Sequence, residues 1–210
     1  GVYRAAKFKM NGSASITDNT ANQGGGVYVD NKSVHMDGAT FNMNDGTISG
    51  NKAKNEKTPN DTNGGGVYVE SGTFEMNGNA SVCGNTAKNG TLNGAGVYVL
   101  GGGTFTMDGR SKVTGNAASG NQSGKNDGGG VYVSMGSKFE MNGEATSVSN
   151  NTATGSGGGV YVAGSLTMND NASVTGNKAT VYGGGVHMGT SRSTVAMNGT
   201  SSIKGNTAGL

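Results

Sequence analysis

The 210-residue sequence is poor in the residues that usually stabilise a globular fold. It contains one Cys, one Pro and no Trp, and Leu, Ile, Val and Phe together number 31 of 210, or about 15%. The single Cys excludes an intrachain disulfide framework and a zinc site built from several Cys. One Pro without a Gly-X-Y period excludes a collagen triple helix. No apolar run approaches the roughly 18 residues that a transmembrane helix needs, so no membrane span is predicted in this segment.

Charge is also scarce, and this argues against simple disorder. The chain has 15 basic and 13 acidic residues, for a formal net charge of +2. Disordered chains usually combine low hydrophobicity with a high net charge. The cations are dispersed along the sequence, so no nucleic-acid-binding surface is predicted. Glycine, in contrast, is abundant, with 42 residues. The composition is therefore compatible with two interpretations: a Gly-rich disordered polymer, or a regular fold that needs few apolar residues per turn.

A repeat that spans almost the whole chain favours the regular fold. Each copy has a Gly-rich turn with V-Y-V, then a segment of the type F-x-M-N, then [I/V]-x-G-N, and finally a variable polar stretch. The copies begin about every 31 residues, and periods of 20 to 50 residues are typical of solenoids and propellers. The last Gly of each turn is Gly1, Gly26, Gly66, Gly96, Gly130, Gly159 and Gly185.

The local pattern within each copy predicts β-strands. In V-Y-V and F-x-M the apolar residues alternate with other residues, which is the period of a strand with one buried face. Three short strands per copy, joined by tight turns, predict a parallel β-helix of about seven coils that spans roughly 34 Å at about 4.8 Å per coil. A β-propeller would need longer repeats and a WD or kelch signature. Residues 1–210 are expected to form one solenoid without evident caps, either a fragment of a longer chain or one unit of a fibre.

Two rows of asparagine are predicted at the bends between strands. The residue before the repeating Asn of the third segment is always Gly, Asn or Asp, which predicts a bend with positive φ in every coil. Stacked Asn side chains can form a ladder of hydrogen bonds between their amides. We therefore expect a structural ladder at Asn19, Asn51, Asn85, Asn116, Asn151, Asn177 and Asn206. A second bend of the same kind is expected at Asn11, Asn44, Asn77, Asp108, Asn142, Asn169 and Asn198.

The repeat resembles those of the polymorphic outer-membrane proteins and adhesin-like proteins of bacteria, which carry a G-G-[A/I] segment and an F-x-x-N segment. The F-x-x-N match is literal in four copies, whereas the third segment and the Tyr of V-Y-V depart from the short family motif. The resemblance implies an all-β, right-handed parallel β-helix. It also implies an extracellular or bacterial cell-surface protein that works in adhesion or as a stalk. The literal matches are Phe8–Asn11, Phe41–Asn44, Phe74–Asn77 and Phe139–Asn142.

No catalytic or cofactor-binding constellation can be named, so neither an enzyme nor a cofactor is predicted. His35 and His187 are far apart, and His187 occupies the Tyr position of its copy. The calcium-binding roll motif G-G-x-G-x-D is absent, because Val and Tyr follow the glycines. No metal site is predicted beyond an incidental loop ion at Asp61 or Asp127. A polysaccharide-active β-helix enzyme stays open as an alternative.

The tyrosines of V-Y-V are the candidate binding surface. If the valines face the core, the Tyr side chains form an outward row, and such rings suit protein interfaces and sugar stacking. Alternatively, the row only stabilises its sheet or is buried. The candidate residues are Tyr28, Tyr68, Tyr98, Tyr132 and Tyr161, with Tyr3 before them and His187 after them.

These observations together predict a non-enzymatic structural or adhesive module that forms a stiff rod at the cell surface or in secreted form. Its expected partners are a host surface or glycan, or further copies of itself stacked end to end. The alternatives are a self-assembling extracellular fibre subunit and a carbohydrate-binding or polysaccharide-active protein. Ice binding is disfavoured, because lysines interrupt the Thr rows that it would need.

Overall fold

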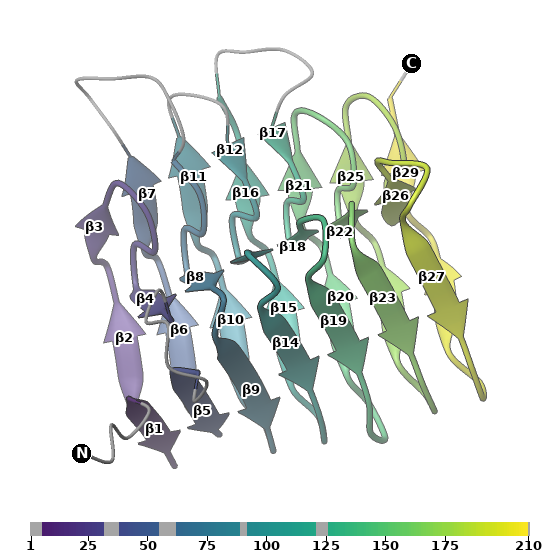
Figure 1. Ribbon diagram of the computed structural model, residues 1–210. Helices are drawn as coiled ribbons and strands as arrows, with labels where there is room; N and C mark the ends of the chain where they lie inside the picture. The colour runs from purple at the N-terminus through teal and green to yellow at the C-terminus, as the bar shows by residue number, and fades with distance from the viewer. Residues whose placement is uncertain (1–5, 32–37, 55–61, 89–91, 121–125, 210) are drawn as a thin grey trace.

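The computed structural model describes residues 6–31, 38–54, 62–88, 92–120 and 126–209. All regular structure in these residues is β-strand, and each coil of the chain adds one strand to each of several parallel sheets (Figure 1). The parallel β-helix predicted from the repeat is confirmed. Among the described residues there is no helix that is both long and apolar enough to cross a membrane.

The F-x-M segments form the first sheet, here called the Phe–Met sheet. Equivalent residues of successive coils pair in register, so Phe41 lies opposite Phe74 and Met43 opposite Met76. The seven strands are β1 Lys7–Asn11, β5 Thr40–Asn44, β9 Thr73–Asn77, β14 Thr104–Met107, β19 Lys138–Met141, β23 Ser165–Met168 and β27 Thr194–Met197.

A second sheet, the Ser–Thr sheet, is formed by the [I/V]-centred segments. Its middle residues face inward, and its flanking residues are mostly Ser and Thr on the outer face. Its seven strands are β2 Ser15–Thr17, β6 Thr47–Ser49, β10 Ser81–Cys83, β15 Lys112–Thr114, β20 Ser147–Ser149, β24 Ser173–Thr175 and β28 Ser202–Lys204.

The V-Y-V segments form the Tyr sheet, which completes the three sheets expected from the sequence. The pairing is again in register, with Tyr68 opposite Tyr98 and His187 opposite Tyr161. Its described strands are β4 Val27–Asp30, β8 Val67–Glu70, β13 Val97–Leu100, β18 Val131–Val133, β22 Val160–Val162 and β26 Val186–Met188.

A fourth sheet, the Thr–Ala sheet, corrects the prediction of three strands per coil. Each of its strands has only two or three residues and follows the Asn of the predicted ladder. The strands are β3 Thr20–Ala21, β7 Lys52–Lys54, β11 Thr86–Lys88, β16 Ala117–Ala118, β21 Thr152–Ala153, β25 Lys178–Ala179 and β29 Thr207–Ala208. In addition, β12 Leu92–Asn93 pairs with β17 Asn126–Asp127 just before the Gly-rich turns.

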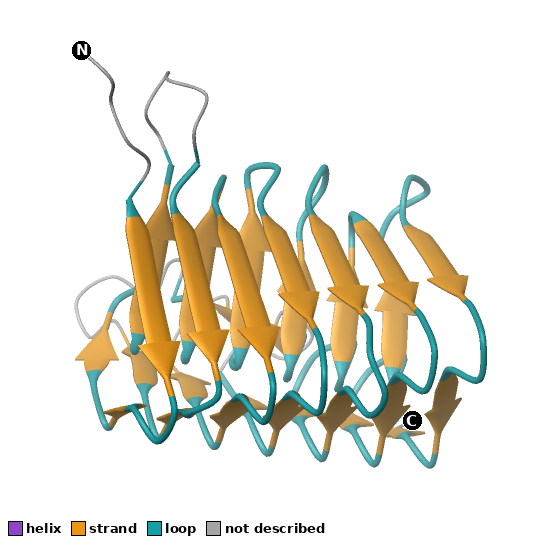
Figure 2. Ribbon diagram, turned by 90° about the horizontal axis from the view of Figure 1, so that it is seen from below, coloured by secondary structure: helices purple, strands orange, loops and turns teal. Residues whose placement is uncertain are grey.

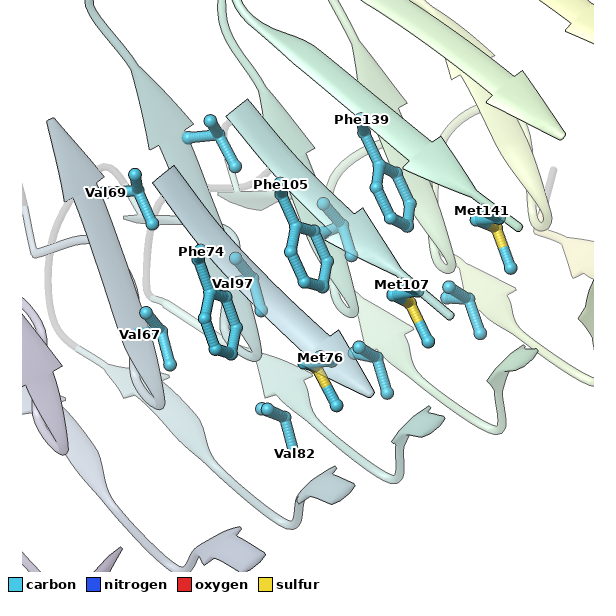
Figure 3. Close-up of a cluster of buried hydrophobic side chains, with 14 of the residues drawn as sticks. Val67, Val69, Phe74, Met76, Val82, Val97, Phe105, Met107, Phe139 and Met141 are labelled. Atoms are coloured by element: carbon cyan, nitrogen blue, oxygen red, sulfur yellow. The ribbon is translucent and has the colours of Figure 1, made fainter. Parts of the chain in front are cut away.

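The strands of successive coils lie side by side along the rod (Figure 2), and one continuous core runs along the inside of these coils. The buried Phe rings stack with centroids 4.7 to 5.0 Å apart, with the Met and Val rows beside them (Figure 3). Because each coil shares its core with the next, few apolar residues per coil suffice. A separate small cluster lies beneath the Thr–Ala sheet and consists of Ala53, Ala87, Ala95 and Ala118.

The bends have the backbone that the sequence predicts. All seven residues before the repeating Asn have positive φ, including the non-Gly residues Asp18 (φ 58°) and Asn150 (φ 53°). The residues after the second row of Asn also have positive φ, as in Asp45 (φ 71°). This left-handed conformation costs a residue with a side chain roughly 1–2 kcal/mol, so Gly occupies most of these positions.

Candidate functional site

The tyrosines of the Tyr sheet form a stacked row outside the core. Val67 and Val69 point into the core, so Tyr68 between them points to the other face of the strand, as strand alternation requires. Neighbouring rings lie 4.7 to 5.1 Å apart between centroids, from Tyr28 to Tyr161. Offset stacking at this distance is favourable for aromatic rings.

The row is not a uniformly exposed stripe. Tyr28 is 40% exposed, whereas Tyr68 is only 5% exposed. Tyr98, Tyr132 and Tyr161 are half-buried. The Gly-rich turn explains part of this covering, because it brings the backbone before the strand against the tyrosines. A Cβ on Gly64, for example, would lie 2.9 Å from the Cβ of Tyr68. The sequence predicted that the Tyr side chains point away from the core, but it did not predict that the Gly-rich turn covers them in part.

The burial of the row affects the ionisation of its phenols. Desolvation raises the pKa of Tyr132, and the neighbouring Tyr98, Tyr161 and Asp127 add to this shift. Desolvation also raises the pKa of Tyr161, with a further contribution from the charge of Asp127. The pKa of Tyr28 is raised by desolvation and by the hydrogen bond that its hydroxyl donates to Glu70. All three phenols stay neutral at physiological pH.

A second group beside the row comes from the segment before each Gly-rich turn. The side chains of Asn63, Asn93 and Asp127 each accept a hydrogen bond from a backbone N–H of the following coil. The shortest joins the Ser156 N–H to Asp127 Oδ1 at 2.6 Å. Burial raises the pKa of Asp127, and this hydrogen bond and the nearby His187 oppose the shift. We call these residues, with Ser156, the pre-turn row.

The asparagines before the Thr–Ala sheet form an inner row that is largely buried. The Asn85 Nδ2 donates to Asn116 Oδ1 at 3.0 Å, and the Asn85 backbone N–H donates to the same oxygen at 2.9 Å. The Asn85 Nδ2 also donates to the Ile48 carbonyl at 3.0 Å. Both donors and both lone pairs of an inner amide are therefore satisfied. The amide-to-amide bond repeats along the row Asn19, Asn51, Asn85, Asn116, Asn151, Asn177 and Asn206.

The asparagines at the end of the Phe–Met sheet form a second, corner row. Here Asn169 Nδ2 donates to Asn142 Oδ1 at 2.7 Å, and Asn198 Nδ2 donates to Asn169 Oδ1 at 2.8 Å. The donors point toward the N-terminal coils, opposite to those of the inner row. Asp108 interrupts the row, and its carboxylate accepts the N–H of Gly109.

The remaining candidates do not assemble into a catalytic or metal centre in the described residues. No group of three or more His, Cys, Asp or Glu that could hold a metal occurs there. Tyr3, His35 and Asp61 lie outside the described residues. Cys83 is half-buried and forms no disulfide. Tyr182, the one tyrosine outside a fixed repeat position, was not predicted as a site residue, and it is 64% exposed.

The geometry thus defines a parallel β-helix repeat protein with regular side-chain rows. The repeat of the Chlamydia polymorphic membrane proteins (Chlamydia_PMP) matches residues 145–163. Residues 145–163 are therefore similar to a repeat of the polymorphic outer-membrane-protein type, and the described residues fold as a parallel β-helix. No curated protein and no solved structure matches the chain.

The matched segment covers the Gly-rich part of the pattern that first suggested the family but not its F-x-x-N part. It begins after Asn142, so the F-x-x-N segment of that copy lies outside it. It covers instead β20, β21, the Gly-rich turn and β22. A repeat of this family indicates a cell-surface, adhesin-like protein.

Proposed function

We propose that this chain is a stiff, non-enzymatic module that presents a binding surface as part of a cell-surface adhesin. The observation that carries the proposal is the combination of one uninterrupted core with a family repeat of adhesin-like type. In a parallel β-helix every coil hydrogen-bonds to both neighbours along its strands, so bending the rod would break several ladders at once. Such a rod holds its outer rows at fixed distances from one another.

Adhesion of coated beads to cultured epithelial cells tests this function. Beads that carry the purified chain should adhere more strongly than beads that carry an unrelated protein of equal mass. Digestion of the chain from the beads before the assay should abolish the difference. Equal adhesion of both kinds of bead, on several cell types, would contradict the proposal.

The absence of enzymatic activity is a separate part of the proposal. Polysaccharide-active β-helix proteins would release new reducing ends or unsaturated products from pectin-like polymers or hexosamine polymers. The chain should release neither, with and without added Ca²⁺. Turnover above a boiled control would replace the structural function with the enzymatic alternative.

Self-association is a second candidate, supported by core-row side chains exposed in the first and last described coils. Phe8 is 45% exposed, and Met188, Met197 and Ile203 are exposed at the other end. Another coil of the same repeat, from a longer chain or a second copy, would cover them by continuing the parallel pairing. For the isolated 210-residue chain, end-to-end stacking predicts a sedimentation coefficient that rises with concentration. A constant monomer value over a hundredfold range would rule it out.

A further inference from the structure

The row of tyrosines ends in an aromatic cluster formed by Tyr161, His187 and Tyr182. Tyr161 and His187 are neighbours in the Tyr sheet, with ring centroids 5.2 Å apart at an angle of 45°. Tyr182 comes from the segment before the next Gly-rich turn, and its ring lies 5.9 Å from that of His187 at 19°. Because Tyr182 is 64% exposed, the cluster offers an aromatic surface to solvent that the buried middle of the row lacks.

The polar atoms of this cluster are not used within the fold. At the other end of the row, the Tyr28 hydroxyl donates a hydrogen bond to Glu70. In the described part of the chain, by contrast, the hydroxyls of Tyr161 and Tyr182 and the ring nitrogens of His187 form no hydrogen bond to another residue. The Tyr182 hydroxyl and the His187 ring nitrogens can therefore donate to or accept from a ligand without breaking an internal hydrogen bond, whereas the Tyr161 hydroxyl lies against Gly189.

Asp127 adds a carboxylate beside the cluster. Its Oδ1 accepts the Ser156 N–H, while Oδ2 has no hydrogen-bond donor among the described residues. Its charge contributes to the raised pKa of Tyr161, and His187 opposes the rise in the pKa of Asp127 itself. In the following coils the equivalent positions are Ser156 and Tyr182, because the Gly128 N–H bonds to Ser156 and the Gly157 N–H to Tyr182. Only the short side chain of Ser156 thus lies between Asp127 and Tyr182 along this row.

We propose that the aromatic cluster and Asp127 bind a neutral hexose or N-acetylhexosamine residue of a glycan. The apolar face of a pyranose ring packs on the exposed Tyr182 ring, and its hydroxyls can form hydrogen bonds with a carboxylate, an imidazole and a phenol. A hydroxyl that donates to a carboxylate forms a stronger bond than a neutral pair. The same carboxylate repels sialic and uronic acids, so acidic glycans are disfavoured. This inference rests on the proposed adhesive function and names its ligand class.

A glycan array followed by calorimetry tests the proposal. The array should hold neutral and N-acetylated oligosaccharides together with their sialylated counterparts, and the chain should retain the neutral ones. For the best neutral oligosaccharide, Tyr182→Ala should weaken binding by roughly tenfold or more, because an exposed stacking ring is lost. Asp127→Asn should weaken the same binding and reduce the discrimination against sialylated glycans. Met135→Ala, in an exposed apolar side chain outside the tyrosine row, is the matched control and should bind like the unmodified chain.

Two results would overturn the proposal: retention of no neutral glycan, or equal affinity of the Tyr182→Ala variant and the unmodified chain. Circular dichroism of each variant excludes misfolding as the cause of a loss, and the exposure of Tyr182 makes misfolding unexpected. The bead assay separates this inference from the proposed function. Beads coated with the Tyr182→Ala variant that adhere normally would leave the adhesive function in place and exclude this site. If neither the beads with the variant nor those with the unmodified chain adhere, the adhesive function itself is rejected.

Discussion

Two rows of asparagine run along the same solenoid in different surroundings. The inner row lies beneath the turn into the Thr–Ala sheet, and Asn51, Asn85 and Asn151 are completely buried. The corner row lies at the end of the Phe–Met sheet, where Asn169 is half-buried and Asn198 is exposed. All seven positions of the inner row are Asn, whereas the corner row contains Asp108.

Burial explains this difference. A buried polar group without a partner costs about 1–3 kcal/mol, and a buried charge costs more. Only an amide has two donors and an acceptor that can join the coil above, the coil below and a backbone carbonyl at once. At the corner, water can replace a lost partner, so a carboxylate at Asp108 is tolerated. The same residue type is therefore required in one row and replaceable in the other.

Removing one amide from each row should show this contrast most strongly. In Asn116→Ala, the Asn85 N–H, the Asn85 Nδ2 and the Val82 carbonyl lose a buried partner. We expect the free energy of unfolding to fall by about 4 kcal/mol. The matched change Asn169→Ala, also between two row neighbours, should cost about 1 kcal/mol or less.

Urea unfolding followed by circular dichroism measures both losses. Equal losses in the two variants would show that burial does not separate the rows. A change in the denaturant slope would signal that the solenoid no longer unfolds as one unit, in which case amide exchange of the Asn85 N–H replaces the global measurement.

Substitution of a glycine next to the inner row should give the next largest loss in the free energy of unfolding. A Cβ on Gly130 would lie 2.8 Å from the Asn151 Nδ2 and 2.6 Å from the Gly159 carbonyl oxygen. Gly130→Ala should therefore destabilise the fold by about 2 kcal/mol through overpacking. Gly84 has positive φ but no atom within 4 Å of its Cβ position, so Gly84→Ala should cost only about 1 kcal/mol of backbone strain.

Amide hydrogen exchange distinguishes the two causes. Gly130→Ala should accelerate exchange at the backbone amide of Asn116, which donates to Asn151 Oδ1. Gly84→Ala should leave exchange at that amide unchanged. Faster exchange at that amide in both variants would mean that the inner row responds to any strain nearby rather than to direct contact.

The pre-turn row is an intermediate case, because it holds a half-buried carboxylate. Burial raises the pKa of Asp127 above the value of an unfolded chain, which is about 3.9. The folded state therefore binds the proton more tightly, so this residue adds stability at low pH. That contribution is lost as the pH rises from the unfolded pKa through the folded pKa. Asp127→Asn should flatten this part of the stability profile, measured as melting temperature against pH. An unchanged profile would contradict the assignment.

Replacing the one carboxylate of the corner row by an amide should give the smallest change in the free energy of unfolding. Asp108→Asn restores an amide between Asn77 and Asn142 and can continue the pattern in which each Asn Nδ2 donates to the preceding coil. We expect a gain of about 0.5 kcal/mol in the free energy of unfolding, typical of an exposed hydrogen bond. A loss would show that Asp108 has a role of its own at this corner.

The sequence could predict those features that are determined by the residue types at one position of the repeat. Gly, Asn or Asp before each ladder Asn predicts positive φ, and the structure confirms it at every such position. The Thr–Ala sheet was missed, because two-residue strands such as Thr152–Ala153 carry no apolar alternation. The cover over Tyr68 was also missed, since it depends on a segment that precedes the strand. For the same reason, the position of Tyr182 and Asp127 beside the Tyr row could not be predicted from the repeat.

The inner ladder has a consequence for how such a protein can change its length. Each coil receives the amide of the preceding coil and offers an identical one to the next, so any two coils are interchangeable neighbours. A gene duplication or deletion that adds or removes one whole repeat would leave every hydrogen bond of the ladder intact, whereas a partial repeat would orphan buried amides on both sides. Recombination between repeats can therefore set the reach of the rod in whole-coil steps, while the outer residues of each coil vary separately.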